Sequence, residues 1–235
     1  MQLSFYNRNN SFDGVSTQPD FEEVFSRLKN TLKNYTQPIV SREKRNIPHN
    51  AFTVLISCIL SLRTKDEVTA QASERLLQTH NTPQQLLQLS EEDIAKKIYP
   101  VGFYKTKAKR IHEISQDLLD RFDGEVPTSF EDLLSLKGVG RKTANIVMVY
   151  GHQKHGYLPI DTHCHRIPNR LGWIDTTTPE ETEYALKKIL PEQYWDDFND
   201  LFVLFGQTIC VPISPFCSTC PIQQFCEQMG VASKR

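Results

Sequence analysis

The sequence predicts an all-α protein, because three features of its 235 residues agree. Apolar side chains recur every three or four positions in most segments, as they do on the buried face of a helix. Serine, threonine and aspartate, which favour helix starts, precede several of these segments. No segment alternates convincingly between polar and apolar residues as a half-buried strand does.

The expected helices follow one another with short connections. They cover residues 21–35, 51–62, 66–77, 82–89, 104–122, 130–136, 179–190 and 195–205, and another begins at Ser90. Thr82 followed by Pro83, and Ser90 followed by Asp93, are typical helix starts. Residues 51–62 are apolar nearly all round and too few to span a bilayer, which predicts a central core helix and no membrane association.

The charge balance limits how this chain can bind nucleic acid. With 27 basic and 28 acidic residues its net charge is −1, so DNA binding requires a local cluster of cations. One candidate is the run Lys105, Lys107, Lys109 and Arg110, although such a run also fits a solvated helix face. The polar first 18 residues contain no apolar signal segment. We therefore expect a flexible N-terminal segment and a cytoplasmic protein.

Four cysteines, Cys210, Cys217, Cys220 and Cys226, lie close together with the spacing C-x6-C-x2-C-x5-C. Disulfides are disfavoured because nothing indicates secretion. Structural zinc usually uses two separated C-x2–4-C pairs, and only Cys217 and Cys220 form one. A compact loop that carries all four thiolates suits a [4Fe–4S] cluster. The spacing therefore predicts a metal centre and favours iron–sulfur over zinc.

Residues 133–146 are expected to form a helix, a Gly-x-Gly turn and a second helix. Gly138 and Gly140, on either side of Val139, allow positive φ and the close approach of a phosphate. The free N–H groups that begin the second helix, with Lys137 and Arg141, favour an anion there. This pattern suits binding of the DNA backbone, but a plain αα-corner remains an alternative.

Lys142 and Asp161 are the candidate reactive groups. Lys142 lies in the first turn of the second hairpin helix, where the helix dipole disfavours a cation and so favours the neutral, nucleophilic amine. It can equally be an exposed lysine. Asp161 is either an N-cap of the following segment or a carboxylate in a cleft. His163 and His165 lack a further ligand, so a metal pair there is disfavoured.

These motifs together resemble the endonuclease III family of helix-hairpin-helix DNA glycosylases. The resemblance rests on LKGVGRKTAN, then IDTH, then the four spaced cysteines, and it covers about residues 21 to 229. It implies a bifunctional DNA glycosylase and AP lyase that acts as a monomer on double-stranded DNA containing damaged bases or abasic sites. The damaged bases are typically oxidised pyrimidines. It also implies a [4Fe–4S] cluster and a location at the nucleoid through DNA.

The resemblance also implies roles for individual residues. Lys142 matches the lysine that attacks C1′ of an extruded nucleotide and forms a Schiff base, and Asp161 matches the carboxylate that assists it. The residues expected to contact DNA are Arg63, Lys137, Gly138, Val139, Gly140, Arg141 and His163. Two domains are expected to flank the DNA cleft. One is residues 44–154, and the other is residues 19–43 with 155–235.

Two departures from the family pattern stand out. Arg63 occupies the position where the family commonly has a glutamine that fills the gap left by the extruded base, and residues 211–216, between the first two cluster cysteines, carry no cation. Two other functions compete with the bifunctional enzyme. One is a monofunctional mismatch or adenine glycosylase of the same superfamily, which Lys142 argues against. The other is a non-catalytic DNA-binding module with structural zinc.

Overall fold

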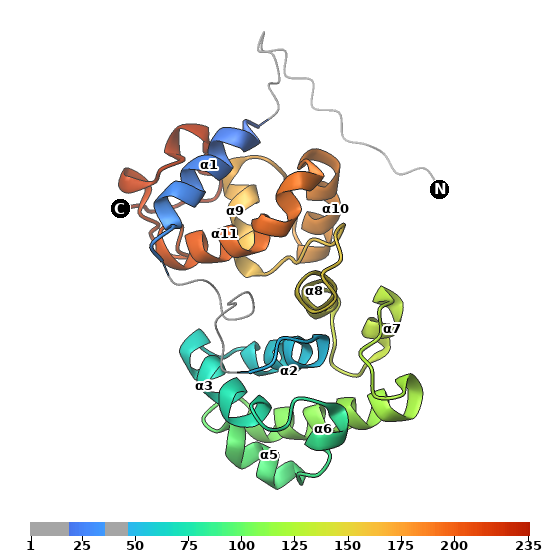
Figure 1. Cartoon of the computed structure of the whole chain (residues 1–235). Helices are drawn as coiled ribbons and strands as arrows, with labels where there is room; N and C mark the ends of the chain where they lie inside the picture. Colours follow the sequence, from blue (N-terminus) through green and yellow to red (C-terminus); the bar gives the residue numbers. More distant parts are fainter. Residues whose placement is uncertain (1–18, 36–46) are drawn as a thin grey trace.

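The computed structural model describes residues 19–35 and 47–235, and over these ranges the chain is helical without strands. The expected flexible segment 1–18 lies outside the described residues. Figure 1 shows the helices gathered into two groups, one above the other. The helices are α1 (Phe21–Leu32), α2 (Ala51–Ser61), α3 (Asp66–Leu77), α4 (Pro83–Leu86), α5 (Glu91–Ile98), α6 (Tyr104–Phe122), α7 (Phe130–Ser135), α8 (Arg141–Ile146), α9 (Thr162–Leu171), α10 (Pro179–Ile189) and α11 (Trp195–Thr208).

Short turns complete the architecture. A π-helical turn, η1 (Val147–Gly151), continues α8, and three 3-10 turns follow later in the chain: η2 (Glu192–Tyr194), η3 (Cys217–Thr219) and η4 (Gln223–Phe225). Several helices begin where the sequence predicts. The Thr82 and Ser90 side chains cap α4 and α5, and Thr178 forms a capping box with Glu181 at α10. The all-α prediction is confirmed.

Helix α9 is the element that the sequence pattern missed. Pro168 lies inside it, and histidines and arginines make up much of its length, so it resembles a loop in sequence. Its buried residues Cys164, Ile167 and Leu171 nevertheless follow helical spacing. Asp161 caps its first turn, and Gly172 ends it in the left-handed conformation with φ +80°.

The first hydrophobic core gathers around α2. Residues 52–60 of this helix are all buried, as its uniform apolar sequence predicts. Helices α3 and α6 pack against it, η1 closes one side, and α5 adds to the same core by packing on α3 and α6. None of the described helices is long and apolar enough to cross a membrane.

The second hydrophobic core joins the N-terminal helix to the C-terminal third of the described chain. Helix α1 packs against α11, next to α9 and α10. Aromatic rings dominate the contact: Phe198 and Phe202 stack with centroids 4.2 Å apart, and Phe25 lies 5.9 Å from Phe202. Helix α8 lies between the two groups in Figure 1, so the hairpin and the residues after it stand at their junction.

Candidate functional site

The helix-turn-helix of residues 130–146 forms as expected, with α7 and α8 joined by the glycine turn. Gly138 has φ +86°, a backbone conformation that residues with a Cβ rarely adopt, and a Cβ there would also displace the Arg110 side chain, 2.9 Å away. Gly140 instead has extended backbone, and a Cβ there would meet nothing within 4 Å. Open space therefore lies beside Gly140. No side chain caps α8, which leaves its first N–H groups free for an anion.

The residues around this turn differ in how accessible they are. The Val139 side chain is buried in the first core, so only its backbone can face a ligand. The Lys137 side chain is 70% exposed and lies 3.4 Å from Glu113, a surface ion pair that contributes little to stability. The cation of Lys137 therefore remains available to a phosphate.

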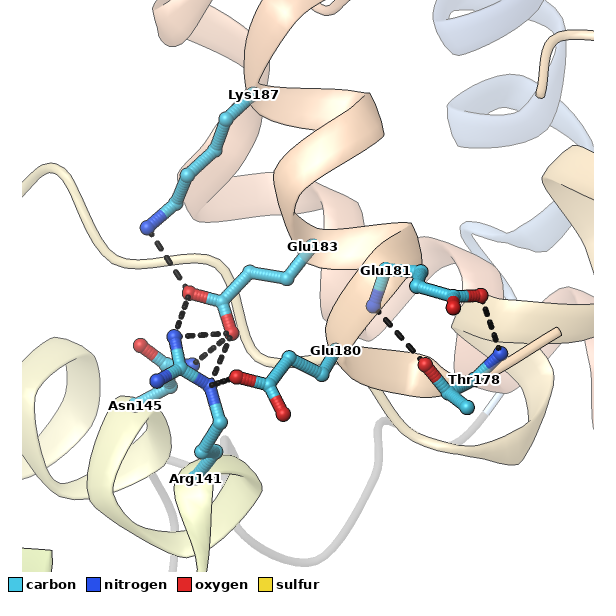
Figure 2. A network of polar contacts seen from close by, with 7 residues as sticks. All are labelled: Arg141, Asn145, Thr178, Glu180, Glu181, Glu183 and Lys187. Carbon is cyan, nitrogen blue, oxygen red and sulfur yellow. Dashed lines mark hydrogen bonds and ion pairs between the residues drawn. The ribbon is translucent and has the colours of Figure 1, made fainter. Parts of the chain in front are cut away.

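The Arg141 guanidinium lies inside a polar network that joins α8 to α10 (Figure 2). It donates to both carboxylate oxygens of Glu183 at 3.2 Å. Asn145 and Lys187 donate to the same carboxylate at 3.2 and 3.0 Å, and the Glu183 side chain is only 4% exposed. Glu180 adds a longer contact of 3.7 Å. The structure thus gives Arg141 an internal partner that its sequence position did not indicate.

Asp161 takes the first of the two roles considered from the sequence, that of an N-cap. Its Oδ1 accepts hydrogen bonds from the backbone N–H groups of His163 and Cys164, both at 2.8 Å, and so caps α9. Its side chain is half-buried, and no hydrogen bond to Oδ2 is present within the described part of the chain. The cap fixes the orientation of the carboxylate through Oδ1.

His163 lies between several charged groups at the junction. Arg166 Nη2 lies 3.1 Å from its Nδ1, and a cation can only donate there, so the ring proton resides on Nε2. Burial lowers the pKa of His163, an effect that the Asp161 charge opposes and that Arg166 and Lys142 reinforce. The ring packs against α11 so closely that a Cβ on Gly206 would lie 2.3 Å from Nδ1. His163 is therefore a neutral, fixed hydrogen-bond donor.

Lys142 lies at the start of α8, and its charge lowers the pKa of His163. Its side chain is half-buried, and among residues 19–35 and 47–235 its ammonium has no hydrogen-bond or ion-pair partner. The charges of Lys142 and Asp161 both act on the pKa values of His163 and Cys164. The charges of two groups that lie nineteen positions apart in the sequence thus act on the same imidazole.

The loop after α2 presents Arg63 beside an exposed aromatic ring. Arg63 has φ +53°, and its guanidinium lies 5.9 Å from the ring of Phe103, which is 63% exposed and also has positive φ. Sequence reasoning missed Phe103. An aromatic residue directly after Gly102 and before a predicted helix is a weak signal without the contact to Arg63.

A buried lysine holds this loop in place. Lys107 Nζ donates to the carbonyl oxygens of Leu60 and Leu62 and to Thr64 Oγ1. Burial lowers its pKa to about 8. Its charge therefore faces inward and does not add to a basic surface, contrary to the interpretation of residues 105–110 as a set of outward cations. Arg110 in the same run pairs with Glu113 at 2.9 Å.

The four C-terminal cysteines line one cavity between α9, α11 and the segment that carries η3 and η4. All four are free thiols, and apolar side chains such as Ile167 and Phe205 share the lining. Burial raises the pKa of Cys220 to about 11, and the three other cysteines add to the shift. Arg170 donates to Cys210 Sγ at 3.4 Å.

The four thiols and Arg170 make up the donor set of this cavity. In the part of the chain that the structure describes, no three histidine, cysteine or acidic side chains converge on one point as the ligands of a single ion do. A cube-shaped cluster instead gives each thiolate its own iron. The donor set, four thiols with an arginine that can balance their charge, also matches an iron–sulfur centre.

Three comparisons place the chain among known proteins. Residues 56–192 match the model of the HhH-GPD superfamily base excision DNA repair proteins. Endonuclease III of Thermotoga maritima is 49% identical over 83% of this chain and 92% of its own length. An endonuclease III homologue of Arabidopsis thaliana is 43% identical, and the match spans 47% of that longer protein.

A solved structure of similar fold adds a DNA complex to these relatives. The structure of a trapped endonuclease III–DNA covalent intermediate superposes with a TM-score of 0.74 at 29% identity. The match covers 88% of this chain and 95% of that one. A thermostable thymine-DNA glycosylase, at 22% identity and a TM-score of 0.70, shares the fold.

The polar network in Figure 2 yields a first prediction. Glu183→Ala leaves Arg141, Asn145 and Lys187 without their shared acceptor, and we expect the free energy of unfolding to fall by about 2–3 kcal/mol. Glu180→Ala is the matched control: its side chain is 57% exposed, so we expect a loss of about 0–1 kcal/mol. Urea unfolding of the two variants measures both values. Equal losses would show that the network does not stabilise the junction.

Proposed function

The chain belongs to the HhH-GPD superfamily of base excision DNA repair proteins, and on that premise we propose that Lys142 is the nucleophile of its reaction. The protein binds DNA and is a DNA glycosylase and AP lyase of the endonuclease III type. The observation that supports the proposal is the half-buried position of Lys142 at the start of α8, without an ion-pair partner among the described residues, where its charge and that of Asp161 act on the same His163 imidazole.

The proposed reaction follows from this arrangement. The neutral Nζ of Lys142 attacks C1′ of the extruded nucleotide, the C1′–N bond breaks, and the base leaves with the bonding electrons and takes up a proton. Loss of a proton from Nζ and opening of the sugar ring give an imine between Lys142 and C1′. Removal of a proton from C2′ then expels the 3′ phosphate and nicks the strand.

Asp161 and His163 assist at different atoms. The free Oδ2 of Asp161 accepts the proton from Lys142 and stabilises the positive charge that develops on the sugar. The α9 cap holds this carboxylate in place through Oδ1. The Nε2–H of His163 donates to a phosphate oxygen beside the extruded nucleotide, since Arg166 occupies Nδ1.

The remaining DNA contacts come from the hairpin and the Arg63 loop. The backbone at residues 138–140, with the Lys137 side chain, holds one phosphate of the duplex. Arg141 supports this contact indirectly. Its guanidinium pairs with Glu183 and so holds the start of α8 in place. Arg63, with Phe103 beneath it, enters the space that the extruded base leaves.

The cluster and the domain arrangement complete the proposal. The ligands of a [4Fe–4S] cluster are Cys210, Cys217, Cys220 and Cys226, and the cluster supplies cross-links that fix the C-terminal segment against α9 and α11. Two domains, residues 44–154 and residues 19–43 with 155–235, flank the cleft, and the two separate hydrophobic cores support this division. The protein acts as a monomer on oxidised pyrimidines in double-stranded DNA.

Covalent trapping tests the nucleophile. The wild-type protein should form a borohydride-reduced adduct with duplex DNA that contains an abasic site, because the reagent reduces the imine. Lys142→Gln should abolish the adduct while the affinity for the same duplex changes less than about threefold, since one contact among many is lost. Lys188→Gln, an exposed lysine on α10, is the control and should trap like the wild type. An adduct that persists in Lys142→Gln would assign the chemistry to another amine.

Metal analysis tests the proposed cluster. We expect about four iron atoms and four acid-labile sulfides per chain, with no stoichiometric zinc. Cys220→Ser should lower the iron content, because it removes one of the four ligands that line the cavity. Cys58→Ala, outside that cavity, should leave it unchanged. One zinc per chain in anaerobically purified protein would refute the cluster and support structural zinc.

A further inference from the structure

Two short loops of the first group of helices are in direct contact. One, residues 62–65, joins α2 to α3, and the other, residues 99–103, joins α5 to α6. A Cβ on Gly102 would lie 2.7 Å from the carbonyl oxygen of Arg63, so the two backbones pack against each other. The Gly102 N–H also donates to Thr64 Oγ1 at 3.2 Å. The two loops therefore form one surface unit, which we call the tip.

Each loop of the tip holds a non-glycine residue in the left-handed backbone region. Arg63 has φ +53° and Phe103 has φ +57°. This conformation is unfavourable for a residue with a Cβ, and it persists only where surrounding contacts impose it. Both side chains are exposed, and the Arg63 guanidinium lies 5.9 Å from the centre of the Phe103 ring. The tip thus presents a cation and an aromatic ring on a backbone that needs support from the rest of the fold.

Lys107 supplies this support from α6. Its ammonium donates to the carbonyl oxygen of Leu60 at 2.8 Å, to that of Leu62, and to Thr64 Oγ1 at 3.1 Å. An ammonium has three N–H groups, so these acceptors use all of them. Lys107 is only 7% exposed, and water does not readily replace hydrogen bonds lost there. Because the Gly102 N–H donates to the same Thr64 hydroxyl, one oxygen joins Lys107 to both loops.

The contact with Thr64 separates positioning from simple stabilisation. A cation at the C-terminal end of a helix is favourable in itself, and Leu60 and Leu62 lie at the end of α2. Those two bonds alone would give Lys107 a role in stability. The bond to Thr64 reaches past the helix end and fixes the loop that carries Arg63, the residue proposed to enter the space of the extruded base.

We infer that Lys107 is a positioning residue for base extrusion. It holds Arg63 and Phe103 in the orientation in which they enter the duplex, and it does so without touching DNA. A loose tip would have to become ordered during extrusion, which would slow that step. This inference rests on the proposed function, because it needs a base that leaves the duplex. An abasic site has no base to unpair or unstack, so its cleavage depends much less on Lys107.

The ratio of base release to abasic nicking tests this role. Lys107→Met keeps the length of the side chain and removes its three N–H groups. In single turnover we expect release of 5-hydroxyuracil from duplex DNA to slow about tenfold to a hundredfold. Nicking of an abasic duplex should stay within about threefold of the wild type. Lys109→Met removes an exposed cation from the same helix and should leave the ratio of the two rates unchanged.

Milder variants alter the tip while the buried cation stays in place. Thr64→Val removes the hydroxyl that joins Lys107 to Gly102 and should lower the ratio about threefold to tenfold. Thr64→Ser keeps the hydroxyl and should retain the wild-type ratio. Gly102→Ala presses a Cβ against the Arg63 carbonyl oxygen and should lower the ratio without any change at Lys107.

Fluorescence reports extrusion without chemistry. A 2-aminopurine next to the lesion brightens when the neighbouring base leaves the stack. In the Lys142→Gln background, where base release is blocked, Lys107→Met should slow this rise. Loss of folded protein alone would lower the amplitude of the signal and leave its rate unchanged.

The possible outcomes are distinct. Equal losses on the lesion and abasic duplexes in Lys107→Met and Gly102→Ala would overturn the inference and assign Lys107 a role in stability alone. Unchanged release of the lesion base in both variants would overturn it as well. A wild-type protein that neither releases the lesion base nor nicks the abasic duplex would refute the proposed function, and the inference with it.

Discussion

The buried carboxylate of Glu183 holds the hairpin helix against the second half of the molecule, and the proposed chemistry depends on this contact. Arg141 binds Glu183, and Lys142 is the next residue on α8. Asp161 caps α9, which packs against α10, the helix of Glu183. The Arg141–Glu183 ion pair, with the longer contact to Glu180, therefore links the segment that carries the amine to the segment that carries the carboxylate. Taking these charges out of water is costly, and the network offsets that cost only when all its members are present.

Most of the fold could be predicted from the sequence because its signals are local. Capping residues such as Ser90 and Thr178 lie within one turn of the helices that they start, and the apolar pattern of α2 identifies a core helix without any partner. The glycine turn and the spaced cysteines are likewise local patterns. Helix α9 was not predicted because Pro168 lies inside it, and proline is disfavoured in the interior of a helix.

The contacts that shape the site could not be predicted because they join distant segments. Arg141 and Glu183 are 42 positions apart, and no pattern in the sequence pairs them. From the sequence, Lys107 resembles a surface cation. In the structure, the carbonyl groups of Leu60 and Leu62 accept hydrogen bonds from its ammonium. Local rules assign a lysine or arginine to solvent, whereas a buried cation needs specific acceptors that only the folded chain brings together.

Identification of the amino acid that is covalently joined to DNA tests the central claim most directly. The adduct formed with abasic duplex under borohydride is digested with protease and nuclease, and mass spectrometry locates the modified residue. We expect a reduced sugar remnant on Nζ of Lys142 and on no other residue. A remnant on a different lysine or on the N-terminal amine would contradict the account, because the groups around His163 would then not be the reaction centre.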